Sequence, residues 1–336
     1  MHDAIYAQRG ALRLVGRGNA QAIAGAAERL HAMDRVVVSG IGSSWHVALV
    51  GELLLAGVGQ LGYRARAIHA FELSRYWPPV PARTGGIMVS HRGAAPAARE
   101  AMEKLATAGA GVAVTGKNAD ELPGAAFTLR TVEQEASGAH TVSVTSALAL
   151  LALLAAEIGH DDAFQHAVDG VPDQLALLLG QESWEELAKR FAGRRRYWFV
   201  GGGPNTATAL EGALKLSETS GARAAGFNCE QFLHGPSAAV TGDDLVILVA
   251  PPGESHAHGL EVARRARQVG AGVLAIVGEG DREMTPLATE TIEIAEVQEL
   301  LSPILAVVPL QLFAYHVALE SGTNPDTMRA HEARGG

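Results

Sequence analysis

The segment RVVVSGIGSSWHVALVGELLLAG, residues 35–57, joins a short run of β-branched residues to a longer apolar run through a glycine-rich turn. A run of valines without polar alternation is typical of a strand buried on both faces of a parallel sheet. The longer run predicts the helix that returns the chain to the next strand. Together they predict an α/β fold built from repeated strand–turn–helix units.

This unit recurs in both halves of the chain. GIMVSH and GVAVTG are further predicted strands of the first half, and the second half repeats the order with YWFVGG, DLVILVAP and GVLAIVG. The halves also share a register, because GAGV at 109–112 returns at 270–273 and Gly42 has its counterpart in Gly203, each 161 residues later. We therefore predict two doubly wound parallel-sheet domains in tandem, related by duplication.

Five segments are predicted along the chain. They are an N-terminal helical segment at 1–30, a first domain at 31–160, connecting helices at 161–193, a second domain at 194–322 and a C-terminal tail at 323–336.

The composition is that of a globular protein. Of the 336 residues, 48% are hydrophobic and 19% are charged, which excludes intrinsic disorder. The net charge of −9 argues against sequence-independent binding to nucleic acid or to an anionic membrane surface, since both need a basic protein surface. A small anionic substrate is compatible with this charge.

The sequence also predicts a compartment. Cys229 is the single cysteine, so no intrachain disulfide is expected. The N-terminus MHDAIYAQRGALRL lacks the apolar core of a signal peptide. The longest apolar run, residues 147–156, is shorter than the roughly 20 residues that span a bilayer. We expect a cytoplasmic protein without a membrane partner.

A row of charges lies on an otherwise apolar predicted helix, EGALKLSETS at 211–220. Glu211, Lys215 and Glu218 are spaced i, i+4 and i+7, which places all three on one helix face. Such a row is either a structural ion-pair network or an active site.

Two glycine-rich junctions are candidate anion-binding loops, because ligands of parallel sheets bind beyond the carboxyl ends of the strands. The first is SGIGSSWH; its serines are also ordinary helix caps. The second is SHRGAAPA, where an arginine before a helix favours an anionic ligand. Neither has the Gly-x-Gly-x-x-Gly pattern of a dinucleotide site. The candidate residues are Gly42, Ser43, Ser44, Ser90, His91, Arg92 and Gly93.

Two further places carry candidate side chains. Glu135, His140 and Thr141 precede a strongly apolar helix, where a helix cap with a surface histidine is the alternative interpretation. His234 stands before Gly-Pro in a forced turn, and a histidine fixed in this way is suited to proton transfer near neutral pH. The stretch SHAHG contains two histidines but lacks a third ligand, so we expect no metal site.

These motifs resemble the tandem sugar-isomerase (SIS) domain family, and in particular the isomerase half of the glutamine–fructose-6-phosphate transaminases, the glucosamine-6-phosphate synthases. The resemblance runs from IYAQRGAL through GGGPNTATALEGALKLSETS and EQFLHGPSAAV to VVPLQLFAYHVALESGTNPD. It implies a sugar-phosphate substrate, no cofactor, and a homodimer with a shared active site between the domains. No glutaminase domain is expected before residue 1, since the N-terminus lacks the cysteine nucleophile of such a domain.

The resemblance implies roles for single residues. Glu218 matches the base that moves a proton between C1 and C2, and Lys215 matches the lysine one turn earlier. Glu211 matches a supporting carboxylate. His234 matches the histidine that opens the sugar ring and reaches the site from a neighbouring subunit.

Other matches concern the loops. Ser43 and Ser44 match the first phosphate loop, and Glu135 matches an acidic residue before the loop that follows the last strand of the first domain. The chain departs from the family at SHRGAA, where the family has Ser-Gln-Ser-Gly-Glu-Thr. Arg92 and Ala95 there replace hydroxyl residues, and the Arg92 guanidinium is a candidate substitute for the lost phosphate contacts.

Three more departures affect the chemistry. His140 replaces a serine and Gln231 replaces a glutamate. The C-terminal MRAHEARGG lacks the lysine that forms a Schiff base in the synthase, and Lys215 is the last lysine of the chain.

The sequence thus predicts a phosphosugar isomerase, acting on a hexose or amino-sugar 6-phosphate with or without deamination. Glu218 is its predicted base and His234 its ring-opening acid/base. The alternative is a non-catalytic sugar-phosphate-binding or sensing protein, which the altered loop and the missing lysine favour.

Overall fold

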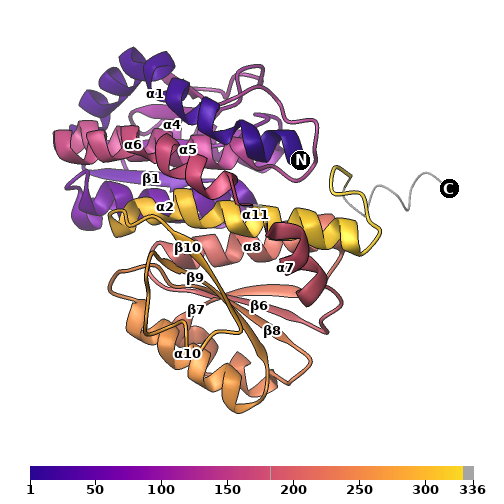
Figure 1. Cartoon of the computed structure of the whole chain (residues 1–336). Helices are drawn as coiled ribbons and strands as arrows, with labels where there is room; N and C mark the ends of the chain where they lie inside the picture. The colour runs from indigo at the N-terminus through magenta and orange to yellow at the C-terminus, as the bar shows by residue number, and fades with distance from the viewer. Residues whose placement is uncertain (182, 328–336) are drawn as a thin grey trace. The chain divides into compact units, whose positions relative to one another are not determined.

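The computed structural model describes residues 1–181 and 183–327 (Figure 1). The described chain has an α/β fold with two parallel sheets of five strands each. Of the C-terminal tail expected at 323–336, residues 328–336 lie outside the described residues.

The first sheet has the strand order β2-β1-β3-β4-β5. Its strands are parallel throughout, and Val38 of β1 is in register with Ile87 of β3. They are β1 (Arg35–Ser39), β2 (Ala65–Ala67), β3 (Thr84–Val89), β4 (Gly111–Thr115) and β5 (Phe127–Arg130). The helices up to residue 179 are α1 (His2–His31), α2 (Ser43–Gly57), α3 (Ala70–Arg75), α4 (Pro96–Ala106), α5 (Val142–Gly159) and α6 (Asp162–Leu179), with a 3-10 turn η1 (Gly62–Arg64).

The second sheet has the order β10-β9-β8-β6-β7. From its other side this order is β7-β6-β8-β9-β10, which is the topology of the first sheet. Its strands are β6 (Tyr197–Gly201), β7 (Ala224–Asn228), β8 (Leu245–Val249), β9 (Gly272–Gly278) and β10 (Glu290–Ile294). The remaining elements are α7 (Trp184–Phe191), α8 (Asn205–Ser220), α9 (Cys229–Leu233), η2 (Pro236–Ala239), α10 (His256–Gln268), η3 (Glu299–Leu301) and α11 (Ser302–Glu320).

Helices cover both faces of the second sheet. The helices α8 and α11 lie side by side on one face, and α10 lies on the other (Figure 1). Gly212 of α8 allows this close packing, because a Cβ there would lie 2.6 Å from Leu310 Cδ1 of α11. The buried side chains between α10 and the sheet include Val246, Leu248 and Val262.

The chain divides into two compact units. One contains residues 7–135 and 142–172, and the other contains residues 1–6, 136–141 and the described residues from 173 onward. Each unit contains one of the two sheets.

Four strands of the structure are missing from the sequence analysis, namely β2, β5, β7 and β10. Each is the edge strand of its sheet. Edge strands are covered less completely than central strands, and all five residues of β7 are only half-buried. They therefore lack the continuous valine-rich runs by which the central strands were recognised.

Two of the described helices are long and apolar enough to cross a membrane. They are α5 and the segment Glu299–Glu320, which includes α11, and 89% and 83% of their apolar windows are buried inside the protein. The uninterrupted apolar run at 147–156 is only part of α5, which extends to 18 residues, so the length expected from that run was too short. Burial on this scale is that of core helices in a globular fold.

Candidate functional site

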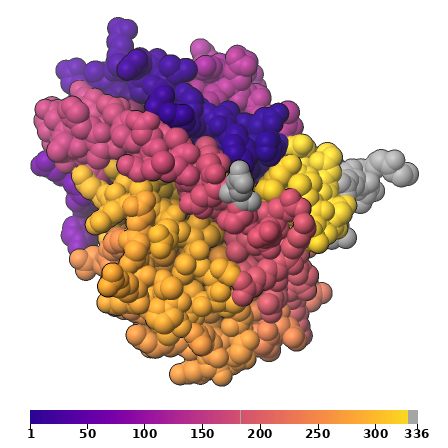
Figure 2. All heavy atoms as spheres, viewed as in Figure 1, coloured from indigo at the N-terminus to yellow at the C-terminus, as the bar shows by residue number. Residues whose placement is uncertain are grey.

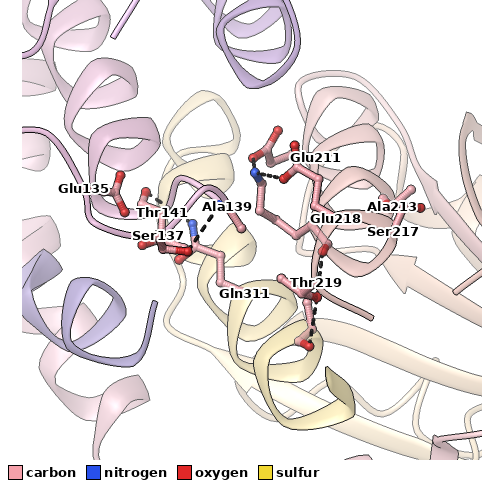
Figure 3. Close-up of polar contacts among 12 residues, drawn as sticks. Glu135, Ser137, Ala139, Thr141, Glu211, Ala213, Ser217, Glu218, Thr219 and Gln311 are labelled. Carbon is pink, nitrogen blue, oxygen red and sulfur yellow. Dashed lines mark hydrogen bonds and ion pairs between the residues drawn. The ribbon is translucent and has the colours of Figure 1, made fainter. Parts of the chain in front are cut away.

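The charged row predicted on α8 forms a buried ion-pair network (Figure 3). Lys215 Nζ lies 2.5 Å from Glu218 Oε2 and 3.4 Å from Glu211 Oε1. The side chains of Lys215 and Glu211 are 1% and 2% exposed, whereas that of Glu218 is 18% exposed. Glu218 is therefore the member of the row that a small molecule can approach.

The two carboxylates keep Lys215 charged in spite of its burial. Burial alone lowers the pKa of the ammonium, because it removes water from the charge. Attraction to Glu211 and Glu218 outweighs burial, so the pKa of Lys215 lies above its ordinary value. Lys215 is a cation at neutral pH, which disfavours it as a nucleophile and suits it to stabilise negative charge.

Hydrogen bonds fix the end of α8 that carries Glu218. Thr323 Oγ1 donates to the Thr219 carbonyl at 2.9 Å, and Thr219 Oγ1 lies 3.2 Å from the Ala314 carbonyl of α11. Gly221 ends the helix in the left-handed conformation with φ 67°, as helix-terminating glycines commonly do. Thr219 and Thr323 were not predicted from the sequence, since only the fold brings the residues after α11 to this turn.

His234 lies at the C-terminal end of α9, where the Gly-Pro turn was expected to hold it. Its side chain is 79% exposed, and its Nε2 lies 3.2 Å from Glu230 Oε2. His258, on the exposed face of α10 (orange in Figures 1 and 2), lies 3.4 Å from the other oxygen of Glu230. The structure thus pairs His234 with Glu230 and leaves its ring open to solvent.

The first candidate loop is a tight turn between β1 and α2. Gly42 has φ 59°, which favours glycine, and a Cβ on Gly40 would lie 2.3 Å from the Ser44 carbonyl oxygen. The turn places Ser43 and Ser44 in the first turn of α2, both half-buried. Their backbone N–H groups and hydroxyls are there at the positive end of the helix dipole.

The second candidate loop follows β3, which is the neighbour of β1 in the parallel sheet. Both loops therefore lie at the carboxyl ends of the strands. Gly93 has φ 68°, and a Cβ there would lie 2.4 Å from the Asp120 carbonyl oxygen. Ser90 is buried, whereas the Arg92 side chain is exposed. The helix α4 begins only at Pro96, so Arg92 precedes it by four residues.

His91 is held among polar groups at the carboxyl ends of the same strands. Its Nδ1 lies 3.4 Å from Thr131 Oγ1, and its carbonyl accepts a 3.0 Å hydrogen bond from Gln134 Nε2. Burial lowers the pKa of His91, with the Arg92 charge acting in the same direction and Glu135 acting against it. His91 is thus a neutral imidazole near pH 7. Thr131 and Gln134 were missed in the sequence because no motif marks them.

Glu135 caps the apolar helix α5. One of its carboxylate oxygens accepts hydrogen bonds from Ser143 N at 3.0 Å and from Ser143 Oγ at 2.5 Å. This favours the helix-cap interpretation of this carboxylate. Thr141 is fully buried, and its carbonyl accepts a hydrogen bond of 3.4 Å from Gln311 of α11 (Figure 3). His140 is half-buried in the same segment.

Residues 190–321 match the model of the SIS domain. Glutamine–fructose-6-phosphate aminotransferase (isomerizing) of Thermococcus kodakarensis is 31% identical over 97% of this chain and 56% of that protein. The chain spans about half the length of the curated relatives it matches.

Solved structures share the fold of the whole described chain. The C-terminal domain of glucosamine-fructose-6-phosphate aminotransferase from Francisella tularensis has a TM-score of 0.86 at 19% identity, covering 97% of both chains. Tagatose-6-phosphate ketose/aldose isomerase from Escherichia coli has a TM-score of 0.81 at 21% identity, covering 97% of this chain and 94% of that one. At these identities the likeness is one of fold.

Proposed function

We propose that the chain catalyses aldose–ketose isomerisation of a hexose or amino-sugar 6-phosphate, with or without deamination. The observation that carries the proposal is the row Glu211–Lys215–Glu218, in which a buried lysine pairs with two carboxylates and the Glu218 side chain is 18% exposed. The SIS match over α8 and the likeness to the isomerizing aminotransferases support it.

In the proposed reaction, Glu218 takes the proton from C2 of the open-chain aldose and returns it to C1. A positioned base contributes about 10²–10⁴-fold to such a step. The Lys215 ammonium stabilises the negative charge of the enediolate and keeps Glu218 ionised. His234 is the proposed acid/base that opens the sugar ring, for which an exposed imidazole is suited.

We assign phosphate binding to the two loops that follow β1 and β3 at the carboxyl ends of the strands of the first sheet. The carriers of this role are Gly42, Ser43, Ser44, Ser90, His91, Arg92 and Gly93. Backbone N–H groups at the start of α2 and the exposed Arg92 guanidinium supply the donors. We infer roles near the substrate for Glu135, His140 and Thr141 from the family resemblance alone.

We further propose that the two sheets are tandem SIS domains related by duplication. Their identical strand order supports this. A homodimer is also proposed, because the His234 ring is 79% exposed and a second copy of the chain can approach it. Light scattering tests the dimer: an active monomer of 35.0 kDa would remove the shared site.

The test of the function is Glu218→Gln, which preserves size and hydrogen bonding but removes basicity. Turnover of the best substrate in a panel of hexose and hexosamine 6-phosphates should fall at least about a hundredfold, with binding little changed. Glu28→Gln on the exposed face of α1 is the matched control. If Glu218→Gln exchanges solvent deuterium into the substrate as fast as the parent, Glu218 is not the base.

The altered loop at 90–95 favours a second candidate, a sugar-phosphate sensor without turnover. Ala95 lacks the hydroxyl found in the related loops. Its absence weakens the contacts with the phosphate but leaves the proposed base, Glu218, unchanged. Saturable binding with no proton exchange for any member of the panel would favour the sensor.

Arg92 distinguishes retained from lost phosphate binding. If its guanidinium contacts the phosphate, Arg92→Ala weakens binding of the 6-phosphate by about 1.5–3 kcal/mol and leaves the unphosphorylated sugar unaffected. Arg29→Ala on the exposed face of α1 is the control. Equal calorimetric affinities for both sugars in the parent protein would show that the loop has abandoned phosphate.

A further inference from the structure

The turn that holds Ser43 and Ser44 has a counterpart in the second sheet. A Cβ on Gly201 would lie 2.2 Å from the Asn205 carbonyl oxygen, as one on Gly40 would lie 2.3 Å from that of Ser44. Gly203 has φ 52° where Gly42 has 59°. Each turn joins a central strand, β1 or β6, to the following helix. The backbone of an anion-binding turn is therefore present twice.

The chemistry of the two turns differs. Pro204 stands at the position of Ser43 and has neither a backbone N–H nor a hydroxyl to offer an anion. Asn205 stands at the position of Ser44, is fully buried, and donates its side-chain amide to Ser302 Oγ at 2.8 Å. The second turn has thus lost two donors of the first.

A carboxylate of the chain itself lies against the second turn. Glu299 Oε2 accepts a 3.2 Å hydrogen bond from the backbone N–H of Glu254, in the loop between β8 and α10. Gly253 makes room for it, since a Cβ there would lie 2.3 Å from the Glu299 carboxyl carbon. On the other side, a Cβ on Gly203 would lie 3.6 Å from Glu299 Oε1. Glu299 is therefore seated between the loops that follow β6 and β8.

The carboxylate before the corresponding helix of the first sheet behaves differently. Glu135, whose counterpart 161 residues later is Glu296, binds Ser143 in the first turn of α5. At the same offset, Glu299 has Gly138 as its counterpart. Glu299 instead reaches across to the loop before α10. Its own backbone carbonyl accepts the Ser302 hydroxyl at 2.6 Å, which holds η3 against the start of α11.

From this contrast we propose that Glu299 is a resident anion that closes the second crevice. The chain then keeps one open site for a dianion, at residues 40–44 and 90–93. The location of that open site rests on the proposed function, whereas the closure by Glu299 rests on the contacts of Glu299 alone. Removing the carboxylate should uncover a second, weak site for a phosphate-type anion between Gly203 and Glu254.

The test counts inorganic phosphate bound per chain by equilibrium dialysis up to millimolar concentrations. Glu299→Ala should bind one more phosphate than the parent protein, whatever number the parent binds. Glu293→Ala, which removes an exposed carboxylate from the neighbouring strand β10, should bind the same number as the parent. Adding Gly253→Ala to Glu299→Ala puts a methyl group into the vacated space and should abolish the extra site.

The proposal fails if folded Glu299→Ala binds no more phosphate than the parent, since Glu299 would then be only a structural brace. Glu299→Ser is the second variant, and its count decides if Glu299→Ala does not fold. An extra phosphate that persists in the Gly253→Ala double variant would also overturn the assignment. Failure of the isomerase proposal is seen separately, as absence of turnover and sugar-phosphate binding in the parent protein.

Discussion

Lys215 donates a hydrogen bond of 2.5 Å to Glu218 from one turn earlier on α8, and it does so from a position that is almost fully buried. The ion pair therefore has an inner, cationic side that solvent does not reach and an outer carboxylate that it does. A general base needs this arrangement, because a nearby cation must stabilise the charge of the carboxylate while the substrate can reach its reacting oxygen.

The first prediction concerns this buried cation. Lys215→Met keeps the length of the side chain but leaves Glu211 and Glu218 without their cation, which should lower the free energy of unfolding by about 3–5 kcal/mol. Lys189→Met, which breaks the exposed Lys189–Glu185 pair, should change it little. Urea denaturation at pH 7 measures both. Equal, small effects would show that the network is not coupled to folding.

The same lysine predicts a change at alkaline pH. Because its pKa is raised in the folded state, its contribution to stability is complete below the unfolded-state pKa of about 10.4 and is lost as the pH rises through the folded-state pKa. The parent protein should lose stability in this window more steeply than Lys215→Met. Parallel curves of unfolding free energy against pH would contradict the assignment.

Gly93 should be irreplaceable in the loop after β3. Gly93→Ala requires a left-handed conformation and pushes a methyl group against the Asp120 carbonyl, so it should cost at least about 2 kcal/mol of stability and weaken phosphate binding. Gly10→Ala in α1, where a Cβ meets open space, should instead stabilise by about 0.5–1 kcal/mol. Thermal unfolding compares the two, and a neutral Gly93→Ala would mean that the loop has another conformation.

His91 should titrate below its ordinary range. Proton NMR should find its pKa lowered, with Glu135→Gln lowering it further and Arg92→Ala raising it, because Glu135 favours the charged imidazole and Arg92 disfavours it. The two variants should therefore shift the pKa of His91 in opposite directions. Shifts of the same sign in the two would rule out this electrostatic arrangement.

Asp244 should contribute to the loss of unfolding free energy at acid pH. It is fully buried and accepts hydrogen bonds from Arg196, from Trp198 Nε1 at 3.2 Å and from Thr241 N at 2.9 Å. Burial raises the pKa of this carboxyl, but these hydrogen bonds outweigh it, so the pKa is lowered. Its stabilisation is present above the unfolded-state pKa of about 3.9 and is lost as the pH falls through the folded-state pKa.

Asp244→Asn should therefore cost about 3 kcal/mol at pH 7 and flatten the acid limb. Asp34→Asn, at an exposed pair with Arg83, is the control. An unchanged acid limb in Asp244→Asn would show that other carboxyls dominate acid unfolding.

The central part of each sheet could be read from the sequence because its cause is local. Valine-rich runs such as Val36–Val38 are buried on both faces wherever they occur in a parallel sheet, and the glycines at 40 and 42 permit a turn that other residues resist. The spacing of Glu211, Lys215 and Glu218 likewise places them on one face of any helix.

Tertiary structure decided what depends on partners distant in the chain. The tertiary fold makes Lys215 a buried cation, and it brings Thr323, about a hundred positions later, to the Thr219 carbonyl. The spacing of charges on one helix cannot say whether water or another helix lies outside that face. The edge strands and the position of Glu299 could not be predicted from the sequence for the same reason, since each is set by a contact between segments that no local pattern encodes.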